Sequence, residues 1–144
     1  MFRKSLRLII LIISVLTVIA GAVQVINPGF VLSAIQGEAS PTAVQLFATI
    51  GLFMFLFGGL MIHSLYSAYP DKVVVFWSGL QKAGAAIAVF IGISKGLFSS
   101  TAALVAGFDL LSALLFFIYL TNKKRKESKI KKALFFLSLH DFFI

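Results

Sequence analysis

The chain has 144 residues, of which 60% are hydrophobic and only 12% are charged, and its mean hydropathy is +1.02. A soluble domain has about a quarter of its residues charged, so this composition excludes a water-soluble globular protein and indicates an integral membrane protein. The chain has no cysteine, which excludes disulfides, cysteine-ligated zinc and iron–sulfur clusters.

Four uninterrupted apolar runs follow one another along the chain, at residues 8–26, 43–62, 73–94 and 100–120. Each is close to the ~20 residues that a helix needs to cross the hydrocarbon core of a bilayer. No alternating pattern typical of a membrane barrel accompanies them. The predicted fold class is therefore all-α: residues 1–122 form an integral membrane four-helix bundle with antiparallel neighbours.

The segments between the runs carry helix-start and helix-stop signals. Asn27-Pro28 and Ser40-Pro41 each combine a capping side chain with a first-turn proline, and Gly37 is typical of a helix end. These signals predict a short interfacial helix at residues 30–36, after the first span, and a second span that begins at Pro41.

Basic residues gather at the two ends of the chain. Arg3, Lys4 and Arg7 precede the first span, a basic run extends from Lys123 to Lys132, and the loop at residues 27–42 has no Lys or Arg. This distribution predicts a multi-pass protein of the inner (cytoplasmic) membrane with both termini cytoplasmic. It also favours anionic lipid over nucleic acid as the partner of the net charge of +8.

Residues 123–144 are predicted to form a basic juxtamembrane tail with an apolar end. The apolar end, from residue 133 onward, is too short to cross the membrane. We expect it to lie in the interface or to dock on a protein partner.

Two charges lie inside the predicted spans, and they are the most informative residues of the sequence. Lys82 and Asp109 both fall near mid-depth when residues are counted from opposite ends of neighbouring helices. Small residues share the helical face of Asp109, so it should face protein: Ala102, Ala106, Ser112 and Ala113. Large residues occupy another face and should contact lipid: Leu104, Phe108, Leu111 and Leu115.

A charge at the bilayer centre costs roughly 2.5–3.5 kcal/mol unless a partner or water offsets it. We therefore expect Lys82 and Asp109 to form an intramembrane charge pair or a ligand site. A pair that fixes helix register and a pair that binds a proton or ligand both remain open from the sequence.

Small and polar residues recur at helical spacing on three spans. Gly84, Ala88, Gly92 and Gly96 form a predicted helix-packing stripe that faces away from Lys82. Two polar stripes are expected to face the bundle, one in the first span and one in the second: Ser14, Thr17, Gly21 and Gln24, and Gln45 with Thr49. Gln24, Asn27 and Gln45 could line an outer vestibule, although interhelical hydrogen bonds explain them equally well.

No complete catalytic, metal or nucleotide motif is present, so the sequence predicts no metal and no cofactor. The only histidines are His63 and His140. His63 is expected at the membrane interface, where an imidazole is more often a headgroup contact than a metal ligand.

Several short motifs over residues 5–122 resemble small bacterial four-helix membrane proteins of the DoxX-like group. They are Gly51-Leu-Phe-Met-Phe-Leu-Phe-Gly58, Tyr69-Pro70, Gly79-Leu-Gln-Lys82, Gly107-Phe-Asp109-Leu-Leu and Phe117-Ile-Tyr119-Leu. The resemblance implies the same fold and gives weight to Lys82 and Asp109. Some members of that group are linked to quinol oxidase complexes or thiol-redox partners, and the lack of cysteine here speaks against a thiol role.

The sequence thus predicts a small non-enzymatic membrane protein that serves as an accessory subunit or forms a homo-oligomer, packing through its glycine stripe. The alternatives are a proton-coupled carrier component and a membrane-embedded enzyme acting on a lipid or quinone, both using Lys82 and Asp109.

Overall fold

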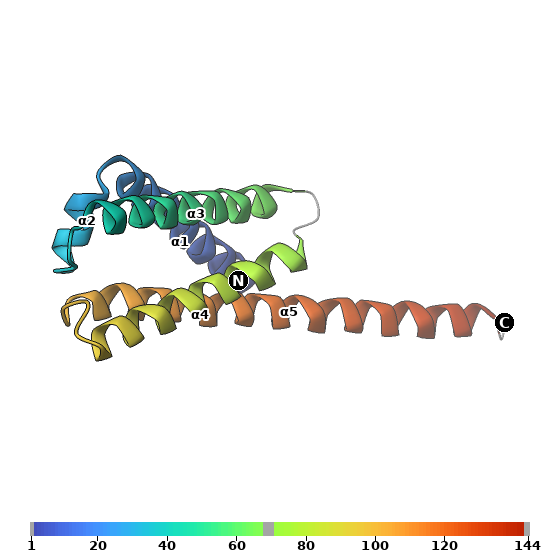
Figure 1. Ribbon diagram of the computed structural model, residues 1–144. Helices are drawn as coiled ribbons and strands as arrows, with labels where there is room; N and C mark the ends of the chain where they lie inside the picture. The colour runs from blue at the N-terminus through green and yellow to red at the C-terminus, as the bar shows by residue number, and fades with distance from the viewer. Residues whose placement is uncertain (1, 68–70, 143–144) are drawn as a thin grey trace.

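A computed structural model describes residues 2–67 and 71–142, and the side chains of residues 4–67 and 71–122. Five helices follow one another: α1 (Phe2–Ile26), α2 (Pro28–Ala34), α3 (Pro41–Tyr66), α4 (Lys72–Ser94) and α5 (Ala102–Phe142) (Figure 1). The described part of the chain contains no strand. Four segments are long and apolar enough to cross a membrane, namely Lys4–Ile26, Pro41–Tyr66, Lys72–Ser94 and Ala102–Asn122. The prediction of an all-helical chain with four such helices is confirmed.

The helices begin where the sequence places capping residues. Asn27 Oδ1 accepts a hydrogen bond from the Phe30 N–H at 3.2 Å, and Ser40 Oγ accepts one from the Ala43 N–H at 3.2 Å. Asp71 caps α4 in the same way, because its Oδ1 accepts from the Val73 N–H at 2.8 Å. Each cap satisfies a backbone donor that the first turn of a helix leaves unpaired.

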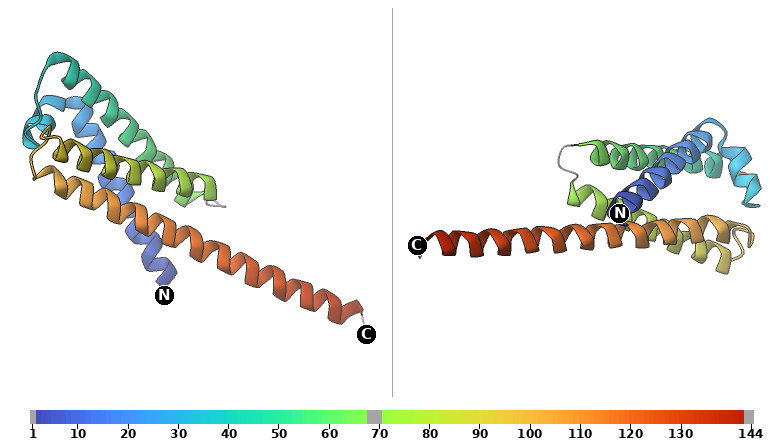
Figure 2. Two further views of the ribbon diagram at one scale, coloured as in Figure 1. Left: turned by 60° about the horizontal axis from the view of Figure 1, so that its bottom comes forward. Right: turned by 180° about the vertical axis from the view of Figure 1, so that it is seen from behind.

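The long helices pack as two pairs, α1 with α3 and α4 with α5 (Figures 1 and 2). In the first pair, Gly21 lies against Gly51 of α3, whereas Ser14, nearer the start of α1, lies against Gly58. In the second pair, Gly79 contacts Phe117, and Gly92 contacts Phe98 near the start of α5.

Polar side chains lie inside the protein, and large apolar side chains lie outside. Ser14, Gln24, Lys82 and Asp109 are all buried, while leucine, isoleucine and phenylalanine side chains are exposed along all four long helices. This arrangement is the reverse of a soluble domain and is the one expected of helices surrounded by lipid. The apolar core lies where α1 begins and α3 ends, and includes Ile10, Met61, Val75 and Phe116.

Close helix packing occurs at a different set of glycines from the predicted stripe. Gly84 and Gly96 have open space around them, Ala88 is exposed, and only Gly92 is covered, by the Phe98 ring. Among the residues whose side chains are described, the stripe therefore meets no other long helix. The backbones approach most closely between α1 and α3, where a Cβ on Gly21 would lie 2.5 Å from the Phe55 nitrogen.

The last helix continues past the predicted end of the fourth span. α5 has 41 residues and runs without a break from Ala102 to Phe142. Figure 2 shows its C-terminal half projecting beyond the other helices. The boundary predicted at residue 122 is thus not a break in secondary structure, because the charged residues that follow it are good helix formers. The predicted lipid-binding run from Lys123 to Lys132, and the side chain of His140, lie outside the described side chains.

Two adjacent glycines of α3 provide a matched test of this packing. A Cβ on Gly58 would lie 2.9 Å from the Ser14 carbonyl oxygen and 3.1 Å from the Val18 nitrogen. These are backbone atoms, which cannot rotate away. A Cβ on Gly59, in contrast, would meet nothing within 4 Å. Gly58→Ala should therefore destabilise the protein by about 1–3 kcal/mol in detergent unfolding. Gly59→Ala should be neutral or stabilising by up to ~1 kcal/mol, since alanine favours helix. Equal effects of the two substitutions would contradict the close approach of α1 and α3.

Candidate functional site

Lys82 of α4 and Asp109 of α5 form a buried ion pair. The Lys82 Nζ donates to the Asp109 Oδ1 at 2.6 Å, and the two side chains are only 3% and 7% exposed. The Phe108 ring adds a cation–π contact, with its centroid 5.3 Å from the Nζ. Each charge is thereby neutralised by the other, which offsets much of the cost of removing both from water.

The faces of α5 explain why Asp109 can reach a lysine on the next helix. Ala102, Ala106, Ser112 and Ala113 are all buried, as the sequence predicted, and their small size lets α4 approach. The predicted lipid face is exposed at Leu104, Phe108 and Leu111. Leu115 is the exception, because it packs against the apolar core.

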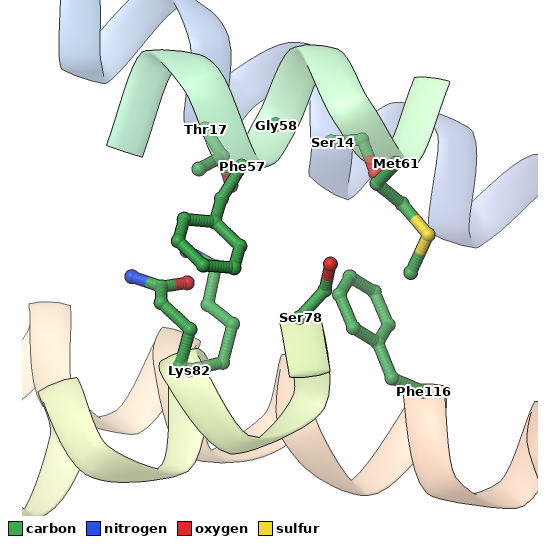
Figure 3. Close-up of a pocket in the computed structure, with 9 residues that line it drawn as sticks. Ser14, Thr17, Phe57, Gly58, Met61, Ser78, Lys82 and Phe116 are labelled. Carbon is green, nitrogen blue, oxygen red and sulfur yellow. The ribbon is translucent and has the colours of Figure 1, made fainter. Parts of the chain in front are cut away.

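A small cavity lies beside Lys82, where the two helix pairs meet. All four long helices line it, with Ser14 and Thr17 from α1, Phe57 and Met61 from α3, Ser78 and Lys82 from α4, and Phe116 from α5. It has room for roughly one water molecule. Figure 3 shows Phe57 and Met61 reaching in from α3, and the Ser78 hydroxyl oxygen pointing into the gap.

The hydroxyl groups around this cavity differ in their hydrogen bonding. Ser14 Oγ donates to the Ile10 carbonyl oxygen at 2.8 Å, and Thr17 Oγ1 donates to the Ile13 carbonyl oxygen at 2.9 Å. The Ser78 Oγ is buried and has no hydrogen-bond partner in the part of the chain that the structure describes. Ser78 is not among the site residues predicted from the sequence, although its position one turn before Lys82 places both on one helical face.

The polar stripe of α1 lies inside the bundle, as expected, whereas the stripe of α3 does not. Ser14, Thr17, Gly21 and Gln24 are buried. Gln45 and Thr49 are exposed, so the expectation that they face the bundle is wrong. The buried face of α3 instead carries Gly51, Gly58, Met61, Ser64 and Leu65, because its glycines rather than its polar residues pack on α1.

The three residues proposed for an outer vestibule have separate roles. The Gln24 Nε2 donates to the Phe47 carbonyl oxygen at 2.8 Å and so links α1 to α3. Asn27 caps α2, and Gln45 is exposed on α3. The interhelical hydrogen bond, which was the alternative for Gln24, is therefore the interaction present.

His63 and the other potential metal ligands are dispersed in the described part of the chain. His63 is exposed in the last turn of α3, and no group of three or more potential metal ligands occurs within residues 2–67 and 71–142.

Among known proteins, the chain matches no family model, no curated protein and no solved structure.

Removing one charge of the pair should cost more than removing both. Lys82→Met or Asp109→Leu alone leaves an unpaired charge in a low-dielectric interior, and each should lower the free energy of unfolding by about 3 kcal/mol. The double variant should recover most of that loss, which gives a positive coupling energy in a double-mutant cycle measured by detergent unfolding. Additive losses would mean that the two charges do not support each other.

Proposed function

We propose that the protein is a small, non-enzymatic integral membrane protein that acts as an accessory subunit of a larger membrane complex. The observation that carries this proposal is that the two charges in the middle of the described apolar helices are buried and paired with each other. Lys82 and Asp109 bind each other at 2.6 Å, and the space beside Lys82 is large enough for only about one water molecule. A site that acted on a lipid or quinone would need room for that substrate beside its acid–base groups.

The surface proposed to bind the partner is the outer face of α4 around Gly84 and Ala88. Both residues are exposed, and a Cβ on Gly84 would meet nothing within 4 Å. Exposed Leu80, Ile87 and Ile91 flank them. Small residues between larger apolar ones allow the backbone of a second helix to approach closely, which is a common means of association within a bilayer.

The proposal includes a placement in the membrane. Four antiparallel spans would cross the inner membrane with both termini in the cytoplasm, as the distribution of Lys and Arg favours. The short helix α2 would lie in the opposite interface, where its exposed Phe30 can enter the headgroup region. The basic run from Lys123 to Lys132 would bind anionic lipid.

The proposal also includes kinship with the DoxX-like group. Its support is the order of short motifs around Gly51, Gly79 and Asp109, together with four apolar helices of suitable length. A role in thiol chemistry is left out, because the chain has no cysteine of its own.

A second candidate function is a component of a proton-coupled carrier. One observation favours it: Lys82 shares its cavity with an unpartnered hydroxyl, that of Ser78. Intramembrane ionisable residues beside polar cavities commonly handle protons or ions.

The size of the native complex tests the accessory role. In mild detergent the protein should migrate with a stoichiometric partner, and Gly84→Leu should release it as a monomer because the bulky side chain blocks the approach of a helix. Gly107→Leu is the matched control, since Gly107 is also exposed with nothing within 4 Å, and it should leave the complex intact. A wild-type protein that is monomeric, or that turns over a lipid or quinone by itself, would contradict the proposal.

A further inference from the structure

The unpartnered Ser78 hydroxyl is the feature of the cavity that calls for a ligand. Ser78 is 3% exposed, and its Oγ is without a hydrogen-bond partner among the described residues. A helical serine or threonine commonly donates to the carbonyl four residues earlier, as Ser14, Thr17 and Ser112 do here. Ser78 differs, because its oxygen points into the cavity (Figure 3). A buried hydroxyl without a partner is costly, so a partner supplied from outside the chain would stabilise it.

Lys82 supplies unused donors to the same space. Its ammonium carries three N–H groups, and within the described chain one acceptor is found for them, the Asp109 Oδ1. Figure 3 shows the Lys82 side chain extending from α4 toward the α1 and α3 helices, behind the Phe57 ring. A ligand in the cavity could therefore accept from Lys82 without disturbing the ion pair.

Ser14 and Thr17 also line the cavity, from the opposite helix pair. Their hydroxyl protons are already used in bonds to Ile10 and Ile13, so toward the cavity they offer lone pairs only. The site thus presents hydrogen-bond donors from Lys82 and acceptors from Ser14 and Thr17. The Ser78 hydroxyl can either donate or accept. A neutral ligand that both donates and accepts fits this set better than an ion of either sign.

We propose that this cavity binds one ordered water molecule, which bridges the Lys82 ammonium and the Ser78 hydroxyl at the junction of the two helix pairs. Its size accommodates a single water, and a buried water needs two to four polar partners, which the four side chains supply. The ion pair is then a hydrated site rather than a dry contact. This inference does not depend on the accessory role.

The sign of one stability change tests the proposal. Ser78→Ala removes a ligand of the water, so Tm in detergent should fall by about 3 °C. If the cavity is dry, the same substitution removes an unsatisfied group and Tm should rise. Ser94→Ala is the reference: it removes an exposed hydroxyl at the end of the same helix, one that donates to the Ile91 carbonyl oxygen and lies outside the cavity. A Ser78→Ala Tm equal to or above that of Ser94→Ala would overturn the proposal.

A second measurement detects the water directly. In bilayer-reconstituted protein, solid-state NMR can follow magnetisation transfer from water to individual residues. Ser78 should receive it faster than Ala86, which is two turns further along α4 and 1% exposed. Transfer to Ser78 that is no faster than transfer to Ala86 would likewise show the cavity to be dry.

Discussion

The pairing of two buried charges is the constraint on which this structure depends. Lys82 and Asp109 each carry a charge that is buried away from bulk water, and they meet at 2.6 Å. The contact requires α4 and α5 to lie side by side in one register, and the buried alanines of α5 make that approach possible. The pairing of these two helices therefore combines a charged contact with the packing of small residues.

The other helix pair, α1 and α3, is stabilised by close packing and hydrogen bonding. Gly21, Gly51 and Gly58 bring the backbones of α1 and α3 together, and the Gln24 amide adds a hydrogen bond across the pair. The apolar core joins the pairs at the end where α1 begins. The small cavity lies at the junction of the two pairs, where α1 contributes Ser14 and Thr17 and α4 contributes Lys82 and Ser78.

The features that the sequence predicts best are those fixed by local chemistry. The four apolar runs and the caps at Asn27 and Ser40 depend on hydropathy and on residues within one helical turn, and the Lys82–Asp109 contact depends on a simple count of residues along two helices. The buried face of α3 could not be predicted. In lipid, either a polar residue such as Gln45 or a glycine such as Gly58 can face a neighbouring helix, and here the smaller side chain is the one that packs. Ser78 was not predicted, because a buried hydroxyl without a hydrogen-bond partner can be identified only when its neighbours in the fold are known.

The most direct test of the account is the distance between the two charged groups in a lipid bilayer. Rotational-echo NMR between 15N at the Lys82 Nζ and 13C at the Asp109 carboxyl should report a separation below about 4 Å. Because other lysines and aspartates carry the same labels, Asp109→Asn identifies the signal of the pair by its loss. Dephasing that is unchanged in Asp109→Asn would show that Lys82 and Asp109 do not pair in the membrane, and the account would be wrong at its centre.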